Sequence, residues 1–375
     1  MKLKVSLVIP TLDRGGAEKQ LVTLATGLDR DRFDARVVTL TRDGPMRSIL
    51  DDAGIPVDSI GKAAKFDPSA YVRLRRLFRR DRPEIVHTWI FAANAYGRSA
   101  ALAAGVPVVI GSERSVDPWK RTWHRYVDAH LARRSTAMTT NSRGVVDFYA
   151  GRGIDPSLFR VIPNGIDPAV PPAIPRDEVA RRLGLDTDRR WIFSIGRLWP
   201  QKNYRDLIWS AELLGCAGEP VTLVIIGDGP QRDELIRHRD ALSTPRHVVI
   251  AGHHDNAASM LKHADVFWIG SRYEGQSNAV MEAMRAGVPV IASDIPGNRD
   301  LVVDQKTGVI VPLCNPAARA TATRTILHDR SMAEAMGQSS KHRIANEFTI
   351  ETMIQSHQTL YQTLAERSRA ATLKN

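Results

Sequence analysis

The stretch SRYEGQSNAVMEAMRAGVPVIASD (271–294) decides the fold of this chain, because it contains a loop, a helix and the start of another strand. Ser277 or Asn278 is a suitable N-cap, the residues that follow favour a helix, and Gly287 provides a C-terminal stop. The apolar run VPVIAS (288–293) then begins a buried strand. A buried strand also precedes the stretch, so the pattern predicts parallel α/β structure.

Two carboxylates lie near the start of the predicted helix. Glu274 precedes it, and Glu282 lies about a turn and a half inside it, since each helical residue rises about 1.5 Å. Both carboxylates would face one crevice with the helix N-terminus, whose N–H groups and partial positive charge suit a diphosphate. Carboxylates also accept hydrogen bonds from sugar hydroxyls. The spacing alone is equally typical of an ordinary amphipathic helix with a solvated Glu282 and a Glu274 in a turn.

Strand-like and helix-like segments alternate along the whole chain, which is typical of parallel sheets. The Pro-rich part of FRVIPNGIDPAVPPAIPRDEVA (159–180) is the expected linker. We therefore predict two α/β domains, residues 1–170 and 171–349, with a helix at about 350–375 that packs back on the first domain. The runs expected as strands are KVSLVIPTL (4–12), ARVVTL (35–40), EIVHTW (84–89), PVVIGSE (107–113), AMTTNS (137–142), RRWIFSIGR (189–197), VTLVIIGDG (221–229), RHVVIAGH (246–253), ADVFWIG (264–270), VPVIAS (288–293) and TGVIVPL (307–313).

Composition narrows the class of protein. A length of 375 residues with 43% hydrophobic and 25% charged residues is typical of a soluble protein of two domains. Cys216 and Cys314 have no metal or redox spacing, which favours a reducing cytosol. The first apolar run is too short for a signal peptide, and no run approaches the ~18 residues of a membrane span. The net charge of +11 indicates an anionic partner: a phosphorylated ligand, an acidic lipid surface or nucleic acid.

Two further loops follow predicted strands. SIGRLWPQKNYRDL (194–207) places Arg197 and Lys202 where α/β folds bind ligands, and this pair of cations suits two adjacent phosphates. Solvated loop cations are the common alternative. Gly15 and Gly16 follow the first strand and would let backbone N–H groups approach an anion. The segment is not GxGxxG, so a dinucleotide fingerprint is not supported.

Five segments, taken together, resemble one family. They resemble the large retaining glycosyltransferase family four, or glycosyl transferases group 1, in which the paired glutamates form the EX7E motif. The resemblance covers almost the whole chain and implies the GT-B architecture: an α/β fold of two Rossmann-like domains whose parallel sheets face each other across a cleft. The segments are VIPNGID (161–167), GRLWPQKN (196–203), IIGDGP (225–230), ADVFWIGSRYEG (264–275) and NAVMEAMRAGVPVIASDIPG (278–297).

The resemblance implies a role for each matched residue. Arg197 and Lys202 would hold the donor's diphosphate and neutralise the leaving group. Glu282 would accept hydrogen bonds from the ribose, and Glu274 would accept them from the transferred sugar. The remaining donor-binding residues would be Gly16, Gly227, His253, Gly275, Gln276, Ser277 and Asn278.

The implied reaction moves a hexose or N-acetylhexosamine, with retention, from a UDP- or GDP-sugar to a glycan. A lipid-linked acceptor in cell-envelope or exopolysaccharide synthesis is expected, because the family's first domain binds the acceptor. No metal or other cofactor is expected, since the cations and the helix dipole take its place and no DxD-type pair stands in a suitable loop. A glycoside hydrolase pair of carboxylates is rejected because Glu282 is committed to the ribose.

One segment departs from the family. Many members have a histidine where this chain has Glu113 and Arg114, so either the donor sugar is held differently or the acceptor site has changed. Glu113 is therefore a candidate catalytic residue, and Arg114 is a candidate for the acceptor site or cleft. His87 and Asn141, at the ends of two other strands, are candidates for the same region, although the family histidine that His87 matches is often structural.

Two basic segments carry aromatic residues, YVRLRRLFRRDR (71–82) and RTWHRYVDAHLARRS (121–135). They suit an anionic membrane, so we expect a cytoplasmic protein that is peripheral at the inner face of the membrane. A solvated cationic face over a buried apolar stripe explains the same pattern equally well.

Two functions of other classes are alternatives to a glycosyltransferase. A sugar-nucleotide epimerase of GT-B-like shape conflicts with the EX7E spacing. A basic nucleic-acid-binding protein would explain the charge, but no nucleic-acid motif supports it, so no nucleic-acid partner is expected.

Overall fold

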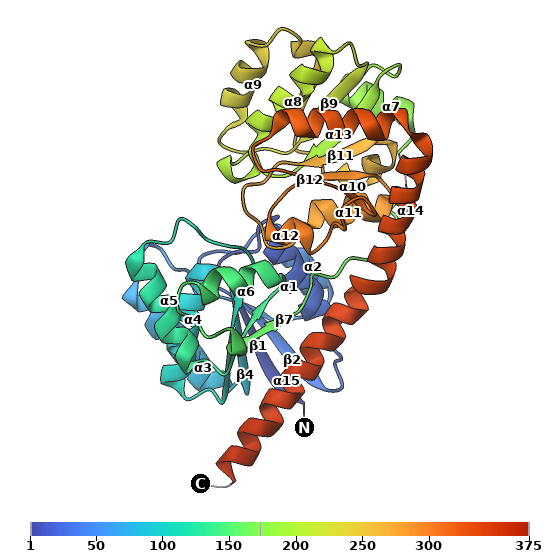
Figure 1. Cartoon of the computed structure of the whole chain (residues 1–375). Helices are drawn as coiled ribbons and strands as arrows, with labels where there is room; N and C mark the ends of the chain where they lie inside the picture. Colours follow the sequence, from blue (N-terminus) through green and yellow to red (C-terminus); the bar gives the residue numbers. More distant parts are fainter. Residues whose placement is uncertain (1, 173, 374–375) are drawn as a thin grey trace. The chain divides into compact units, whose positions relative to one another are not determined.

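The chain folds into two compact units in the computed structural model, which describes residues 2–172 and 174–373. The first domain comprises Met1–Gly165 and Ile350–Asn375, and the second comprises Ile166–Thr349. Figure 1 shows the helices and strands of each domain. Each domain contains a parallel sheet with helices on both faces, so the predicted α/β class is confirmed.

The first domain has, over the described residues, a seven-stranded sheet in the order β3-β2-β1-β4-β5-β6-β7. Its strands are β1 (Leu3–Ile9), β2 (Phe33–Thr39), β3 (Val57–Ser59), β4 (Ile85–Trp89), β5 (Val108–Glu113), β6 (Ala137–Thr140) and β7 (Phe159–Val161). Its helices are α1 (Gly16–Gly27), α2 (Arg47–Asp52), α3 (Pro68–Asp81), α4 (Ile90–Ala104), α5 (Thr122–Arg134), α6 (Arg143–Ala150) and α15 (Ile350–Thr372), with a 3₁₀ turn at Pro156–Leu158.

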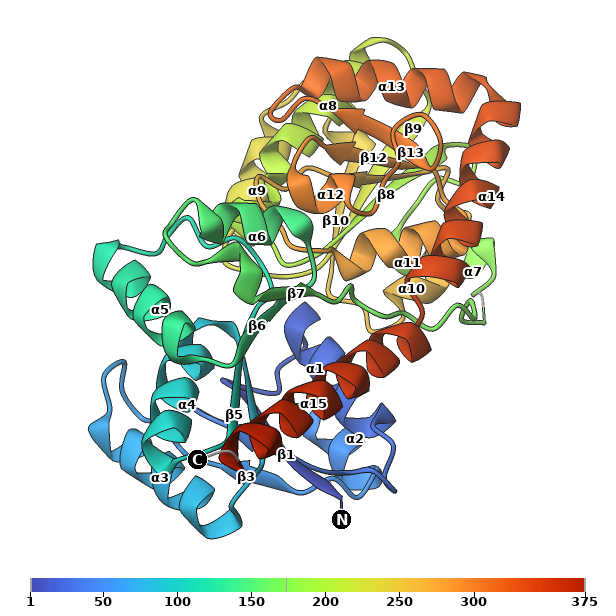
Figure 2. The ribbon, with the colours of Figure 1, turned by 60° about the horizontal axis from the view of Figure 1, so that its bottom comes forward.

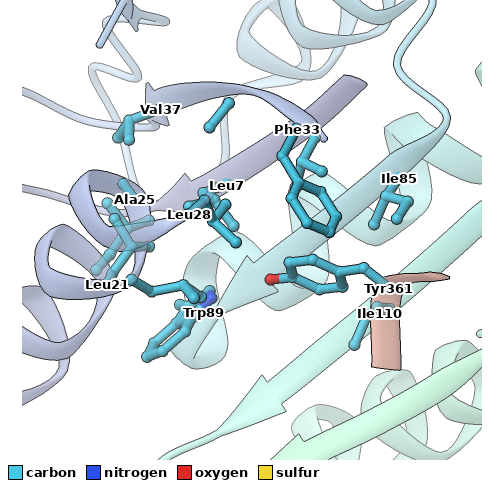
Figure 3. Close-up of a cluster of buried hydrophobic side chains, with 14 of the residues drawn as sticks. Leu7, Leu21, Ala25, Leu28, Phe33, Val37, Ile85, Trp89, Ile110 and Tyr361 are labelled. Carbon is cyan, nitrogen blue, oxygen red and sulfur yellow. The ribbon is translucent and has the colours of Figure 1, made fainter. Parts of the chain in front are cut away.

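The two faces of this sheet have different cores, because side chains alternate along each strand. In β4, Ile85 and Trp89 pack with α1 and α15, whereas Val86 packs with α3 and α4. The last helix completes the first of these cores: Tyr361 of α15 is fully buried, and its ring centroid lies 6.2 Å from that of Phe33 (Figure 3). The end of the chain is therefore part of the first domain.

Helix α15 extends from Ile350 to Thr372. It lies along the first domain in both views of the ribbon (Figures 1 and 2). The Gln358 side chain accepts a hydrogen bond from the backbone N–H of Asp29 at 2.8 Å, which fixes the helix against the loop before β2.

The second domain has, again over the described residues, a six-stranded sheet in the order β10-β9-β8-β11-β12-β13. Its strands are β8 (Arg190–Ile195), β9 (Val221–Ile226), β10 (Val248–Gly252), β11 (Val266–Ile269), β12 (Val290–Ser293) and β13 (Gly308–Val311). Its helices are α7 (Arg176–Leu183), α8 (Tyr204–Cys216), α9 (Arg232–Asp240), α10 (Ala257–Met260), α11 (Asn278–Ala286), α12 (Pro296–Arg299), α13 (Pro316–His328) and α14 (Arg330–Glu347), with 3₁₀ turns at Pro200–Lys202, Pro245–His247 and Leu261–His263.

The strand order positions the site. Strands β8 and β11 are neighbours, and the chain continues from them toward opposite edges of the sheet. Their following loops therefore diverge at the carboxyl ends of the strands, which is where open α/β sheets bind ligands. In the first domain β1 and β4 occupy the equivalent positions.

Every strand expected from an apolar run is present, but β3 and β7 were not predicted. Each of these edge strands has three residues, too few for a periodic pattern. Strand β7 lies just before the Pro-rich part that was expected as the linker. The domain boundary falls at Gly165 and Ile166, just before the Pro-rich run.

Candidate active site

Two cations lie in the loop after β8. Lys202 ends the 3₁₀ turn Pro200–Lys202, and its Nζ forms an ion pair with the Glu274 carboxylate from the loop after β11. The Arg197 side chain is exposed and forms no hydrogen bond or ion pair with the other described residues. The structure therefore joins Lys202 to Glu274 and leaves a second cation accessible in the same loop.

Backbone and side-chain hydrogen bonds tie these two loops together. The Arg272 N–H donates to the Gln201 carbonyl at 2.9 Å, and Gln201 Nε2 donates to the Tyr273 carbonyl at 2.8 Å. Ser271 Oγ donates to Glu274 Oε1 at 2.9 Å, which orients the carboxylate toward Lys202. We did not single out Gln201 or Ser271 from the sequence; the only signal was their place beside strand ends.

Close backbone packing brings neighbouring strand ends together. A Cβ at Gly227 would lie 2.0 Å from the carbonyl oxygen of Gly196, so only glycine allows these strand ends to approach. The Gly227 N–H donates to the Gly252 carbonyl at 2.8 Å, and His253 follows directly. His253 is half exposed, with Nε2 3.0 Å from Asp255 Oδ1. The predicted donor-binding residues Gly227 and His253 thus follow two adjacent strands.

The EX7E helix begins as expected. Ser277 is its N-cap, although its hydroxyl makes no capping hydrogen bond, and Gly287 ends it with φ of 77°. Residues 275–278 lead from Glu274 into the first turn, which brings a helix N-terminus to the paired cation and carboxylate. Glu282 is partly exposed in α11, three residues before the buried Arg285. Burial lowers the pKa of Arg285, and the nearby Glu282 opposes that shift.

Gly16, the remaining donor-binding candidate, opens α1 in the first domain. One turn later, Gln20 Nε2 donates to the Gly165 carbonyl at 2.9 Å, and the Gly165 N–H donates to Gln20 Oε1 at 3.0 Å. The start of α1 is thereby fixed to the VIPNGID segment.

Glu113, at the end of β5, is almost completely buried. Its carboxylate accepts hydrogen bonds from Asn94 Nδ2 at 3.0 Å and Tyr149 OH at 2.9 Å, and it lies 3.3 Å from Lys120 Nζ. Burial alone would lower the pKa of Lys120, but the carboxylates of Glu113 and Asp128 raise it overall. The candidate catalytic carboxylate is therefore engaged within the first domain.

His87 is also buried within the first domain. Its Nδ1 lies 2.7 Å from Tyr361 OH and its Nε2 lies 2.9 Å from Thr139 Oγ1, so both ring nitrogens have partners. Burial lowers the pKa of His87 well below its usual value, with further lowering from His357 and Arg114. His87 is therefore neutral and contributes to the contact between the sheet and α15.

Arg114 and Asn141 share one partner. Arg114 Nη2 donates to Asn164 Oδ1, and Asn141 Nδ2 donates to the same oxygen at 3.2 Å. The Arg114 guanidinium lies over the Trp89 ring, with its carbon 4.5 Å from the ring centroid. These two candidates for the acceptor side are thus neighbours at the ends of β5 and β6.

Within the part of the chain that the structure describes, no group of three or more His, Cys, Asp or Glu side chains could hold a metal ion. Over the same residues, no helix has both the length and the apolar character to cross a membrane.

Comparisons with protein families cover most of the chain. The family model described as "Glycosyl transferases group 1" matches residues 175–343, and that described as "Glycosyltransferase Family 4" matches residues 14–170. Both models describe glycosyltransferases, so neither supports the epimerase or the nucleic-acid-binding alternative.

Curated relatives match almost end to end. The UDP-Gal:alpha-D-GlcNAc-diphosphoundecaprenol alpha-1,3-galactosyltransferase of Escherichia coli is 26% identical, over 92% of this chain and 96% of the relative. The 2-deoxystreptamine N-acetyl-D-glucosaminyltransferase of Streptomyces fradiae is also 26% identical, over 92% of this chain and 84% of the relative.

Solved structures show the same fold. HepE of Anabaena, crystallised with UDP and glucose, has a TM-score of 0.86 at 20% identity and covers 96% of this chain and 99% of its own. Sucrose-phosphate synthase from Thermosynechococcus elongatus has a TM-score of 0.82 at 18% identity, over 97% and 99%. With both halves matched by family models, the chain belongs to the group 1 glycosyltransferases of family four, with the GT-B fold, and it is a glycosyltransferase.

Proposed function

We propose that this protein transfers a hexose or N-acetylhexosamine from a nucleotide-diphosphate sugar to a glycan acceptor, with retention at the anomeric carbon and without a metal. The observation that carries the proposal is the Lys202–Glu274 ion pair beside the accessible Arg197. The E. coli relative is named for a UDP-galactose donor and a diphosphoundecaprenol-linked acceptor, which supports a UDP-sugar and a lipid-linked acceptor here.

The charges of the crevice suit the leaving group. As the bond between the anomeric carbon and the diphosphate oxygen breaks, negative charge develops on that oxygen. Arg197 and Lys202 would stabilise this charge, together with the N-terminus of α11. These groups supply the positive charge that a metal ion provides elsewhere, and this is the basis of the metal-free proposal.

The carboxylates would orient the donor. Glu274, oriented by Lys202 and Ser271, would accept hydrogen bonds from hydroxyls of the transferred sugar, and Glu282 would accept them from the ribose. The acceptor hydroxyl would attack the anomeric carbon from the face that the diphosphate leaves, and its proton would pass to the departing phosphate oxygen. Neither glutamate would act as the nucleophile.

The buried first-domain candidates take other roles in this proposal. Glu113, paired with Lys120, would hold the loop after β5 in place, and His87 would anchor α15. Glu113, which stands where many family members have a histidine, would then change how this loop is supported. Its carboxylate would not be one of the reacting groups.

Release of the nucleoside diphosphate from a panel of UDP- and GDP-sugars tests the reaction. Arg197→Ala should lower kcat by about 10²–10³-fold, the usual effect of removing one group that stabilises developing charge. Glu282→Ala should weaken binding of the donor. Arg237→Ala is the matched control, because Arg237 is an exposed arginine of α9 in the same domain.

The assignment of the site is wrong if Glu282→Ala leaves donor binding intact, or if Arg197→Ala behaves like Arg237→Ala. NMR of the product would establish the anomeric configuration. A product of inverted configuration would exclude the retaining mechanism.

We also propose that the first domain meets an anionic membrane through α5 and the loop before it. Trp119 and Trp123 are 52% and 54% exposed, and both rings pack on Phe91. Arg121 and Arg125 are exposed in the same segment. Aromatic side chains flanked by cations are typical of surfaces that bind the lipid headgroup region.

Helix α3, the other basic segment, is less suited to this role. Its apolar residues Leu74, Leu77 and Phe78 are buried in the domain. Arg73 Nε donates to the Ile60 carbonyl at 2.8 Å, and Arg75 Nε donates to the Ala103 carbonyl at 3.2 Å. The alternative of a cationic face over a buried apolar stripe therefore describes α3.

Flotation with vesicles that contain anionic phospholipid tests the membrane proposal. The protein should float with the vesicles at low salt, and a smaller fraction should float at high salt. The double variant Trp119→Ala/Trp123→Ala should reduce the floated fraction at least several-fold. Val72→Ala is the matched control, since Val72 is an exposed apolar residue of α3. Salt-insensitive behaviour, or equal flotation of the two variants, would contradict the role of α5.

A further inference from the structure

Buried polar atoms without partners gather at the carboxyl ends of β4, β5 and β6. A buried polar group left without a hydrogen bond costs about 1–3 kcal/mol, so such atoms are uncommon and need an explanation. In the described part of the first domain, the buried side-chain atoms that lack a partner are Trp89 Nε1, Ser112 Oγ, Arg114 Nε and Nη1, Asn141 Oδ1, Ser142 Oγ and His357 Nε2.

These residues lie close to one another. Arg114 and Asn141 both donate to Asn164, and the Arg114 guanidinium lies over Trp89. The rings of Trp89 and His357 are stacked, with centroids 6.2 Å apart. Ser112 is the register partner of Trp89 on the neighbouring strand. The unsatisfied atoms of Trp89, Ser112, Arg114, Asn141 and His357 therefore lie in one group at the carboxyl ends of the strands, where parallel α/β domains bind ligands.

Arg114 is the unusual member of this group. It is 8% exposed, and its only hydrogen-bond partner among the described residues is the neutral amide oxygen of Asn164. Burial without a nearby carboxylate lowers the pKa of Arg114 to about 9. A buried charge normally has an opposite charge beside it, because an unpaired one is costly.

Other buried cations of the same domain follow that rule. Arg98 lies 3.3 Å from the Asp128 carboxylate, and Lys120 lies 2.8 Å from the same carboxylate. Arg114 thus lacks the partner that its neighbours have, while two of its nitrogens still have hydrogen-bond capacity. The missing partner is best supplied by an anionic ligand, since guanidinium groups bind phosphate and carboxylate well.

We propose that Arg114, with Ser112 and Asn141 beside it, binds an oxyanion carried by the acceptor. The phosphate of a lipid-linked or phosphorylated sugar and the carboxylate of an acidic sugar share this chemistry. The inference rests on the proposed function, which assigns the donor's diphosphate to Arg197 and Lys202 in the second domain. It adds that the acceptor is anionic and that the first domain recognises its charge.

Calorimetric titration of the full chain tests this site, with pyrophosphate and glucuronate as separate probes. UDP is kept saturating, so that the donor's diphosphate site is occupied. We expect binding of one probe to the wild-type protein and at least tenfold weaker binding to Arg114→Met. Arg133→Met, which changes an exposed arginine of α5, should bind like the wild type. The probe that binds identifies phosphate or carboxylate as the group recognised.

Stability gives a second readout that separates a ligand site from a structural residue. Replacing an unpaired buried charge with an apolar side chain of similar length should leave the Tm unchanged or raise it. Arg114→Lys keeps the charge and loses the planar fork, so it should bind the probe with intermediate affinity and provide a folded variant in any case.

Equal probe binding by the wild type and Arg114→Met, or no probe binding to the wild type, would overturn the inference while leaving the proposed function intact. A fall in Tm for Arg114→Met with unchanged probe binding would also overturn it. Failure of UDP itself to bind would instead count against the proposed function.

Discussion

Glu113 and Arg114 are adjacent at the end of β5, but they lie in opposite environments. Glu113 belongs to a cluster of paired charges with Lys120 and Asp128. Its carboxylate also accepts hydrogen bonds from Asn94 and Tyr149. Arg114 has one neutral acceptor and two nitrogens without partners. Successive side chains point to opposite faces of a sheet. The carboxyl end of β5 therefore carries a buried charge with partners on one face and a buried charge without an ionic partner on the other.

We interpret the Glu113 cluster as part of the scaffold, and Arg114 as part of the proposed ligand site. Removing one partner of a buried charged group destabilises the domain, because the remaining charge is left buried without compensation. A buried charge that has no partner lowers the stability of the fold, and such costs are typical of positions that bind a ligand. The second domain shows a related contrast at its surface. Lys202 is paired with Glu274, whereas Arg197, five residues earlier, is accessible.

Removal of Lys120 should have the largest effect on stability. Lys120→Met would leave the carboxylates of Glu113, Asp117 and Asp128 together without their shared cation. We expect a loss of about 3–5 kcal/mol in the free energy of unfolding, measured by urea denaturation of the full chain. Lys65→Met, at an exposed lysine, should change it by less than about 0.5 kcal/mol. A small effect of Lys120→Met would mean that the cluster is not the scaffold inferred here.

The same cluster should make stability depend on pH. Burial, with a further contribution from Glu113, raises the pKa of Asp128 from 3.8 to about 6. The folded state thus binds this proton more tightly than the unfolded chain, so the contribution of Asp128 to stability is full below about pH 4. It is lost as the pH rises through about 6. Urea denaturation between pH 4 and pH 7 should show a smaller decrease for Asp128→Asn than for the wild type. An identical slope would contradict the raised pKa.

A neutral buried hydrogen bond on the Arg114 face of the sheet should contribute less to stability than Lys120 does. Tyr361→Phe would leave His87 Nδ1 without the hydroxyl that lies 2.7 Å away. We expect a loss of about 1–3 kcal/mol, measured by thermal or urea unfolding, because the nitrogen stays buried. Tyr126→Phe serves as the control, since Tyr126 is 73% exposed. Equal stability of the two variants would show that His87 does not anchor α15.

The smallest effect should come from a hydroxyl that has no partner. Ser112→Ala removes an oxygen that is buried beside Arg114 without a hydrogen bond. The free energy of unfolding should change by less than about 0.5 kcal/mol or rise slightly, because no protein contact is lost. A loss above about 1.5 kcal/mol would show that this hydroxyl is structural and would weaken the contrast with the Glu113 face.

The sequence predicted most of the fold because hydrophobic periodicity is a local property. Each apolar run marked a strand, Gly287 marked the end of α11, and the alternation of elements predicted two parallel sheets. Strands β3 and β7 were missed because three residues carry no periodic signal. The glycosyltransferase function, predicted from five ordered motifs, is confirmed by the family matches to both halves.

The candidate site was predictable in part. The loops after β8 and β11 were identified because ligands bind at strand ends, and the structure joins them through Lys202 and Glu274. Ser271 and Gln201 were not identified, since nothing in the sequence tells which loop a short polar side chain will contact. The individual roles of the donor-site residues remain proposals that the variants above test.

By itself, the sequence determined the family and the α/β class and indicated the loops proposed to carry the chemistry, because these depend on patterns within a few dozen residues. Only the tertiary structure decided which charges are paired. Glu113 is satisfied by Tyr149 and Asn94, whereas Arg114 has no carboxylate partner among the described residues, although the two residues are neighbours in the chain. Pairing depends on which distant elements pack against each face of the sheet, and that information is absent from local spacing.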